Sequence, residues 1–378
     1  MTENIKQVDP HAAYLELQPQ IDAAVQEVVA SGWYLMGQQV ASFEEALAAS
    51  VGAGHAIGAG NGTDALELCL RAADIGEGDI VVTVSHTAVA TVAAIELAGA
   101  APLLVDIDPL SYTMDPAQLA LAIEQHPERD RIKAIIVVHL YGCPAEMDSI
   151  AQIASRYDLM LIEDCAQAQG ASYRGQAVGS MGAAATFSFY PTKNLGALGD
   201  GGALLVHSPA LEEQARVVAQ YGWRERFVSH VCGMNTRLDE IQAAVLNVKL
   251  PHLAHHNQRR REIAMAYTAG LEACAAITTP LQPKASDHVF HQYVIETSAR
   301  DALASFLQEH GIATGIHYPM PVHLQPAYKN RVDCGPGGMQ HTEAASSRIL
   351  SLPMYPQLTD AQVGRVCETI CKWQAAER

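Results

Sequence analysis

The chain of 378 residues is short of positive charge and of long apolar runs. Lysine and arginine number 24 against 41 aspartates and glutamates, so the formal net charge is −17. The longest basic run is Arg259-Arg260-Arg261, which is too little to hold a nucleic-acid backbone. No segment reaches about 18 consecutive apolar residues, the length expected of a transmembrane helix. We therefore expect neither a nucleic-acid partner nor a membrane span.

Several chemical signatures are also missing. The eight cysteines include no C-x-x-C pair, and the first residues, MTENIKQVDPHAAY, lack the apolar core of a signal peptide. We expect reduced thiols and a cytoplasmic location. No P-loop and no G-x-S-x-G elbow occurs. The histidine clusters near 255, 288 and 317 lack the cysteines or carboxylates of a metal site, so we expect no metal.

From about residue 54 the sequence alternates between short apolar runs and helical segments. Most of the runs lack polar alternation, which indicates strands buried on both faces. The strands are expected at 55–59, 79–84, 101–107, 133–140, 159–164, 184–189 and 202–208. The helices between them are expected at 63–73, 88–97, 116–124, 147–157 and 210–221. This rhythm predicts an α/β fold with a mostly parallel mixed sheet covered by helices.

The rhythm stops near residue 222, which suggests a second domain. A helix is predicted over 237–275 in two pieces split at Pro251, and the first 50 residues should hold two helices. Further elements are expected as strands near 289–295 and 313–317 and a terminal helix over 359–375. We expect a large domain over 1–250 and a smaller C-terminal α/β domain over 251–378.

The first candidate site is the turn Gly58-Ala59-Gly60-Asn61-Gly62-Thr63, between a strand and a helix. Glycines let the backbone approach an anion, and the free N–H groups of the following helix can bind a phosphate. The spacing is not that of a dinucleotide site, and the next strand ends without the acid that would hold a ribose. An ordinary tight turn is the alternative.

Asp164 and Lys193 are the second and third candidates. Asp164 closes an apolar strand, where α/β proteins place ligand contacts, and Gln167 lies three residues further on. A helix cap or a metal ligand would explain Asp164 equally well. Lys193 stands in the uncharged segment TFSFYPTKNLGALG, where lost hydration would lower its pKa and make the amine a nucleophile. The alternative is a surface lysine in a glycine-rich loop.

The three candidates together predict a pyridoxal phosphate site. The lysine would hold the aldehyde as a Schiff base, and the aspartate would keep the pyridine nitrogen protonated. The glycine turn and a hydroxyl such as Ser188 would anchor the phosphate.

The sequence also resembles a known family, the DegT/StrS-type sugar aminotransferases, which are pyridoxal phosphate enzymes of fold type I. The resemblance covers about residues 10–375 and rests on the segments SGWYLMGQQVASFE, GNGTDALELCLRA, EDCAQAQGASYRG, FSFYPTKNLGALGDGGA, GMNTRLDEIQAAVL and HYPMPVHLQPAY.

The resemblance implies a role for each site residue. Lys193 and Asp164 would be catalytic. The cofactor would also contact Gly62, Thr63, Gln167 and Ser188, with His86 against the ring face and Asn235 reaching the phosphate of the neighbouring subunit. The substrate side would include Trp33, Tyr34, Arg237, His317 and Tyr318. A homodimer with shared active sites follows.

The implied activity is transfer of an amino group from L-glutamate to a nucleotide-linked keto-deoxysugar. A lysine at 193 favours transamination over the sugar dehydration of relatives that carry histidine there. The segment that follows Lys193, NLGALGDGG, resembles family members that act at C3 of a keto sugar. Members that act at C4 more often have the sequence GEGG there. A C4 aminotransferase and a cofactor-binding regulatory protein remain the alternatives.

Overall fold

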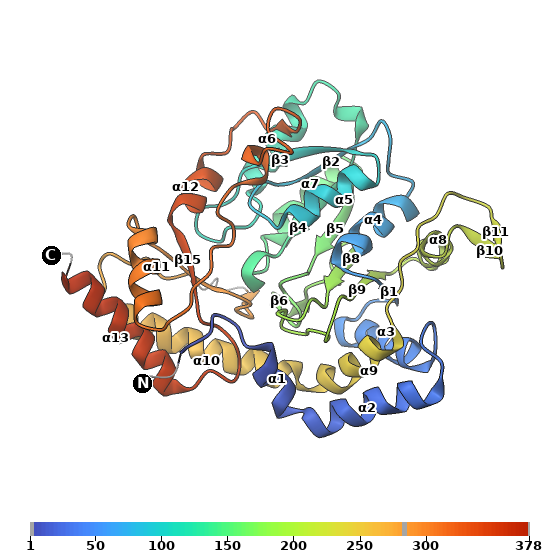
Figure 1. Cartoon of the computed structure of the whole chain (residues 1–378). Coiled ribbons are helices and arrows are strands. Elements are labelled where there is room, and N and C mark those ends of the chain that lie inside the picture. The colour runs from blue at the N-terminus through green and yellow to red at the C-terminus, as the bar shows by residue number, and fades with distance from the viewer. Residues whose placement is uncertain (1–3, 282–285, 377–378) are drawn as a thin grey trace.

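The computed structural model describes residues 4–281 and 286–376 and is built around one large twisted sheet (Figure 1). Eight strands pair in the order β1-β9-β8-β5-β4-β2-β3-β14. Their bounds are β1 His55–Ala59, β2 Ile80–Val84, β3 Ala101–Val105, β4 Ile132–Val138, β5 Met160–Asp164, β8 Ala184–Ser188, β9 Gly202–Val206 and β14 Asp333–Cys334. Only β9 pairs antiparallel with both of its neighbours, so the other seven strands point the same way.

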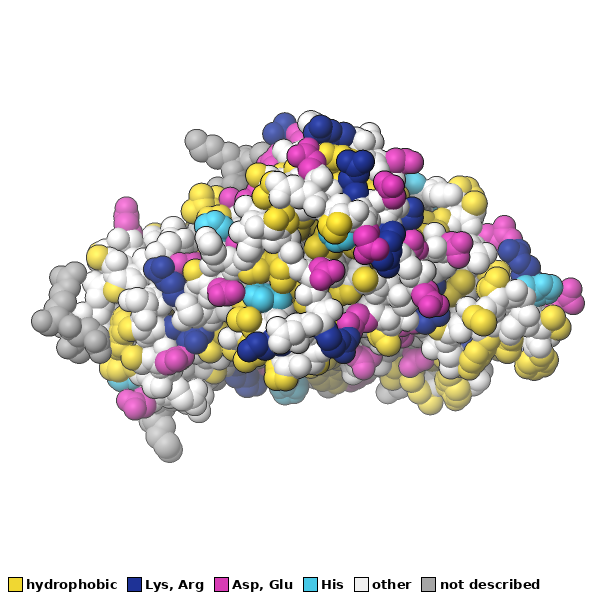
Figure 2. All heavy atoms as spheres, turned by 90° about the horizontal axis from the view of Figure 1, so that it is seen from above, with side chains coloured by type: hydrophobic (Ala, Val, Ile, Leu, Met, Phe, Trp, Pro, Cys, Tyr) yellow, Lys and Arg dark blue, Asp and Glu magenta, His cyan; other side chains and the backbone are white. Residues whose placement is uncertain are grey.

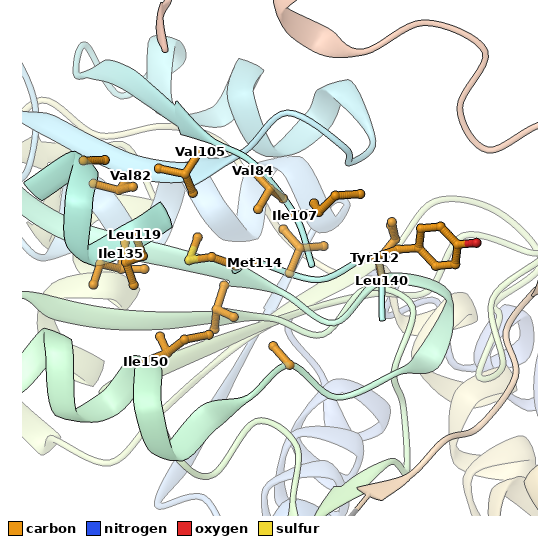
Figure 3. Packing of buried hydrophobic residues seen from close by; sticks show 14 of the residues in the cluster. Val82, Val84, Val105, Ile107, Tyr112, Met114, Leu119, Ile135, Leu140 and Ile150 are labelled. Carbon is orange, nitrogen blue, oxygen red and sulfur yellow. The ribbon is translucent and has the colours of Figure 1, made fainter. Parts of the chain in front are cut away.

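Helices cover both faces of this sheet because its strands are apolar on both sides. On one face α6 and α7 pack on β2, β3 and β4, in a core that includes Val82, Leu119, Ile135 and Ile150 (Figure 3). On the other face α4, α5 and α8 form a second core. The bounds are α4 Gly62–Ala72, α5 Val89–Leu97, α6 Pro116–Gln125, α7 Met147–Arg156 and α8 Pro209–Ala219.

A third layer of helices lies below the sheet in Figure 1. There α2 and α3 pack on α9, and α10 continues from α9 through a short 3-10 turn. The bounds are α1 Pro10–Glu16, α2 Gln18–Ser31, α3 Gln38–Val51, α9 Glu240–Lys249 and α10 Leu253–Leu271. Pro251 lies in the 3-10 turn Leu250–His252, at the predicted split.

The C-terminal part has its own apolar core, in which α10, α11 and α13 surround the antiparallel pair β13–β15. Ile5 belongs to this core, so the N-terminal segment crosses to it. The bounds are α11 Arg300–Glu309, α12 Gln340–Arg348, α13 Asp360–Ala376, β13 Tyr293–Glu296 and β15 Ile349–Leu352. The division of the chain at residue 250 stays a prediction.

Among the described residues, five further short strands form one three-stranded sheet and one two-stranded hairpin. They are β6 Ser172–Tyr173, β7 Gln176–Ala177, β10 Trp223–Glu225, β11 Val228–Ser229 and β12 Ser286–Asp287. The β10–β11 hairpin projects from the body at the right of Figure 1. Among the described residues no helix is long and apolar enough to cross a membrane.

The α/β fold with a mostly parallel mixed sheet is confirmed, and each predicted strand of the large sheet is found within about two residues. Two other predictions are wrong. The first 50 residues hold three helices, because the backbone leaves the helical region at Leu17 and α2 begins beside Pro19. No strand forms at 313–317, where Gly315 makes only an isolated bridge to Ser351, on the edge of β15 that does not face β13.

Candidate active site

Six of the residues predicted to serve a cofactor line one cavity of about 540 Å³. They are Gly62, Thr63, Asp164, Gln167, Ser188 and Lys193. The cavity opens at the carboxyl ends of the parallel strands, because Asp164 closes β5 and Ser188 closes β8. This is the edge at which α/β sheets bind ligands.

The turn before α4 forms one wall of the cavity. Asn61 caps the helix, with its Oδ1 accepting from Asp64 N–H at 2.9 Å. Two close approaches explain one glycine of this turn and one at the start of β9. A Cβ on Gly62 would lie 2.7 Å from Ser188 Cβ, and a Cβ on Gly202 would lie 2.3 Å from the Asn61 carbonyl oxygen. The backbone N–H groups at the start of α4 and the hydroxyls of Thr63 and Ser188 thus line one cradle for an anion.

Asp164 is buried on the floor of the cavity. Its Oδ2 accepts from the Thr91 hydroxyl at 2.9 Å and its Oδ1 from Ala166 N–H at 3.1 Å. Burial raises the pKa of Asp164, while these hydrogen bonds and the Lys193 charge oppose the rise. A carboxylate in this setting is stabilised by a cation that arrives with a ligand. Thr91 was missed by sequence reasoning, because a threonine inside a helix gives no signal of its partner.

Lys193 reaches the same cavity from the loop after β8, where its backbone N–H donates to Tyr190 O at 2.8 Å. Burial lowers the pKa of Lys193 to about 8, and the attraction of Asp164 opposes this. The amine is therefore mostly protonated at neutral pH, with about a tenth of it unprotonated at pH 7 and about half at pH 8. The expectation of a desolvated lysine agrees with this environment.

His86 lies behind the cavity and is not part of its lining. The Tyr141 hydroxyl donates to the His317 carbonyl oxygen and accepts from His86 Nε2, at 2.8 Å. His86 Nδ1 has no hydrogen-bond partner among residues 4–281 and 286–376, and burial lowers the pKa of the ring to about 4. The next residues along the chain, Thr87 and Ala88, do line the cavity. The ring-face role of His86 stays a prediction.

Tyr141 connects several of the predicted site residues and was not foreseen. Its backbone is left-handed, with φ 60°, a conformation that tyrosine rarely adopts. In this position its N–H donates to Gln167 Oε1 at 2.7 Å, while its hydroxyl reaches His86 and His317. Gln167 Nε2 in turn donates to the Tyr318 hydroxyl at 3.1 Å. Tyr141 therefore fixes the wall behind the cavity.

His317 and Tyr318 come from the C-terminal part of the chain. His317 Nδ1 bonds the Ser351 hydroxyl at 2.8 Å, and burial together with the Lys193 charge lowers the pKa of His317 to about 4. Burial raises the pKa of Tyr318 to about 12. Both side chains are therefore uncharged at neutral pH and can offer hydrogen bonds to a substrate.

None of the five predicted substrate residues lines the cavity, although Tyr318 bonds Gln167, which does. Asn235, which was predicted to contact the cofactor phosphate of a neighbouring subunit, does not line it either. Trp33 and Tyr34 are 65% and 51% exposed on the loop between α2 and α3. Asn235 is exposed and Arg237 half-buried, and Arg237 lines a different cavity. Within one chain the structure does not bring these four side chains to Lys193.

His139, Glu163 and Cys165 form a buried group next to the site, at the ends of β4 and β5, and their possible metal-ligand atoms lie within 4.8 Å of one another. Glu163 already accepts from the backbone N–H groups of Gly179, Met181 and Gly182, and from His139 Nε2 at 3.1 Å. His139 Nδ1 accepts from Ala145 N–H. These bonds use the ligand atoms of His139 and Glu163, and the Cys165 thiol donates to the Glu163 carbonyl oxygen at 3.7 Å, so the group is structural. The lowered pKa of Glu163, despite its burial, agrees with this bonding.

The donor set fits pyridoxal phosphate. An anion cradle, a buried carboxylate and a desolvated primary amine face one cavity of sufficient volume. The cradle suits the phosphate, the carboxylate suits a protonated pyridine nitrogen, and the amine suits the aldehyde. The fold and the cavity thus define a pyridoxal phosphate enzyme.

The chain belongs to the DegT/DnrJ/EryC1/StrS aminotransferase family, whose model matches residues 16–371. It is 44% identical to a pleiotropic regulatory protein of Geobacillus stearothermophilus over 98% of both chains. It is 41% identical to the dTDP-3-amino-3,4,6-trideoxy-alpha-D-glucose transaminase of Streptomyces venezuelae, over 100% of this chain and 97% of that one. The crystal structure of S. venezuelae DesV with a ketimine intermediate matches with a TM-score of 0.94 at 41% identity, covering 99% of each chain. The protein is an aminotransferase and its cofactor is pyridoxal phosphate.

Proposed function

We propose that the enzyme transfers the amino group of L-glutamate to C3 of a nucleotide-linked keto-deoxysugar, of the dTDP-3-keto-6-deoxyhexose type. The observation that carries the proposal is the meeting of Lys193, Asp164 and the phosphate cradle in one cavity. The position C3 is supported by the NLGALGDGG text after Lys193 and by the name of the S. venezuelae transaminase.

Each residue has a task in this proposal. When bound, pyridoxal phosphate supplies a ring that accepts the electron pair left at the substrate carbon. Asp164 holds a proton at the ring nitrogen, and Thr91 and Ala166 N–H hold Asp164 in place. Lys193 would hold the aldehyde carbon through Nζ; once the amine of glutamate had displaced it there, Nζ would be free to accept the proton from Cα of glutamate. A pKa of about 8 suits this amine to both accept and release a proton.

The phosphate would be held by the start of α4, Thr63 and Ser188, and the ring hydroxyl by Gln167. His317 and Tyr318, both uncharged, would bind the substrate. The Gln167–Tyr318 hydrogen bond joins the cofactor side of the site to the substrate side.

The proposal includes a homodimer with shared active sites. Asn235 and Arg237 lie away from the cavity of their own chain, as they must if they serve a neighbour. The exposed apolar run from Trp33 to Met36 and the projecting β10–β11 hairpin offer an interface (Figure 1). The unpaired state of all eight cysteines supports a cytoplasmic location.

A regulatory protein that only binds the cofactor is the second candidate, favoured by the name of the Geobacillus relative. An aminotransferase and such a regulatory protein differ in how the bound cofactor responds to glutamate. An aminotransferase bleaches the visible band of the bound cofactor when glutamate is added, whereas a passive binder does not.

The test is the second half-reaction. The pyridoxamine form of the enzyme is mixed with matched 3-keto and 4-keto sugars linked to dTDP or UDP, and return of the visible band is timed. We expect the dTDP-linked 3-keto sugar to react fastest, with Lys193→Ala as the inactive control. Preference for 4-keto sugars would make this a C4 enzyme, and no reaction after a glutamate response would exclude keto sugars.

A further inference from the structure

A second, small cavity of about 40 Å³ lies behind the Lys193 loop and plays no part in the proposed reaction. Its walls come from the N-terminal segment, from the loop Pro191–Gly196, from the end of α9 and from α10. Three basic side chains contribute to its lining in addition to Lys193: Lys249, His256 and Arg260. This concentration of cations is unexpected in a chain with a net charge of −17.

Arg260 is the main anomaly. Its side chain is buried, with the residue only 4% exposed, yet it forms no ion pair with any described residue. Nη1 donates to the carbonyl oxygens of Phe290 and Met354 at 3.2 Å each, while Nε has no partner. Burial lowers the pKa of Arg260 to about 9, so the guanidinium stays charged at neutral pH. A buried charge without a counter-charge is costly.

Lys249 adds a second unpaired cation. Its Nζ donates to Gly196 O at 2.7 Å and pairs with no carboxylate among the described residues. Burial lowers the pKa of Lys249 to about 8, which leaves most of it protonated at neutral pH. His256 is held by Glu16 at 3.2 Å, and burial lowers its pKa, so it contributes little charge.

The nearby carboxylates do not balance these two cations. Asp9 lines the cavity, but its oxygens accept from Lys6 at 2.9 Å and from Ala12 N–H at 3.2 Å. Glu16 accepts from His256 and from Gln357 Nε2. Both carboxylates therefore already accept hydrogen bonds from other groups. The positive charges of Arg260 and Lys249 are left without a counter-charge in the cavity.

We propose that this cavity binds a small monovalent inorganic anion, of the size of chloride, between Arg260 and Lys249. The volume suits such an ion, since about 10–15 Å³ is needed for one water-sized occupant. It is too small for a phosphate ester or a nucleotide. The ion would supply the counter-charge that the protein lacks and would brace the loop that carries Lys193, through Lys249 and Gly196.

The test uses the holoenzyme with chloride and bromide as probes. Thermal unfolding is measured while chloride replaces gluconate at constant ionic strength. We expect Tm to rise with the logarithm of the chloride concentration above the dissociation constant, and to be higher by about 2 °C at roughly tenfold that constant. Crystals grown with bromide and measured at the bromine absorption edge should show an anomalous peak between Arg260 and Lys249.

Variants locate the effect. Lys249→Met should abolish the chloride dependence and the bromide peak. Arg260→Met should also abolish the chloride dependence and the bromide peak. If Arg260→Met does not fold, the result for Lys249→Met alone tests the proposal. Arg261→Met is the matched control, since Arg261 lies on the same helix and, within the described part of the chain, its side chain bonds to Gln258 near the surface. An unchanged Tm across the chloride series would overturn the proposal, and so would a bromide peak without any effect in solution.

Discussion

Asp164 and Lys193 show how far single residues could be read from the sequence. Both stand out because a charged side chain follows or lies among apolar residues, and the structure places both in one cavity. Thr91 and Tyr141 could not be found in this way. Their roles depend on which strand ends and loops meet in space. The role of Tyr141 also depends on its left-handed backbone conformation, which the sequence does not predict.

The lowered pKa of Lys193 is testable in the apoenzyme. Trapping of its unprotonated amine by formaldehyde and borohydride, followed by peptide mapping, should show a midpoint near pH 8. An ordinary exposed lysine has its midpoint near about 10.4. Because Asp164 attracts the protonated amine, Asp164→Asn should move the midpoint to lower pH. A midpoint above 10 in the unaltered protein would show that Lys193 is not desolvated.

Tyr141→Phe tests the wall behind the cavity. Phenylalanine keeps the edge-to-face packing on Tyr112, whose ring centroid is 5.7 Å away, but removes the hydroxyl. Both nitrogens of the buried His86 are then without partners, so we expect a loss of about 1–3 kcal/mol in the free energy of unfolding. Tyr157→Phe, which removes an exposed hydrogen bond to Glu124, is the control and should change stability little. Equal effects of the two substitutions would contradict the account.

At the scale of elements, the strands of the large sheet were predictable because each is a continuous apolar run between turn residues. The order of the strands in the sheet was not predictable from the sequence. Strand β9 lies between β1 and β8, and β14, which begins at Asp333, pairs with β3 at the opposite edge of the sheet. Such pairings depend on contacts between distant segments. The two errors, at Leu17 and at 313–317, also lie where local sequence leaves the choice to packing.

The loop that carries Trp33 and Tyr34 is anchored to α9 by one carboxylate. Glu240 accepts from the backbone N–H groups of Gly37, Gln39 and Val40 at 2.8–3.0 Å, and so caps α3. Glu240→Gln should weaken these charge-assisted bonds and speed hydrogen exchange at residues 37–40, by about tenfold for a loss of 1.4 kcal/mol. Glu45→Gln, at an exposed position of α3, is the control. Unchanged exchange in Glu240→Gln would show that α3 does not depend on this cap.

At the scale of the whole molecule, charged side chains of both signs are spread over the face shown in Figure 2. The aspartates and glutamates of this face do not gather in a single patch. The shared active site is the main prediction at this scale. Lys193→Ala removes what a subunit gives its own site, whereas Asn235→Ala with Arg237→Ala removes what it would give its neighbour. In a mixed dimer one site collects all the defects and the other is intact, so co-expression should restore up to about half of the activity.

The mixed dimers are isolated with two affinity tags, and each parent protein alone serves as the inactive control. If verified mixed dimers are as inactive as the parents, Asn235 and Arg237 act within their own subunit.

We propose that one site moves nitrogen from glutamate to C3 of a nucleotide-linked sugar. The most direct test of this proposal is a full turnover with L-glutamate labelled with the heavy nitrogen isotope and a dTDP-linked 3-keto-6-deoxyhexose. Nuclear magnetic resonance of the purified product should show the label bonded to C3, together with formation of 2-oxoglutarate, and Lys193→Ala should yield no labelled sugar. A product without the label, or with the label at C4, would contradict the account.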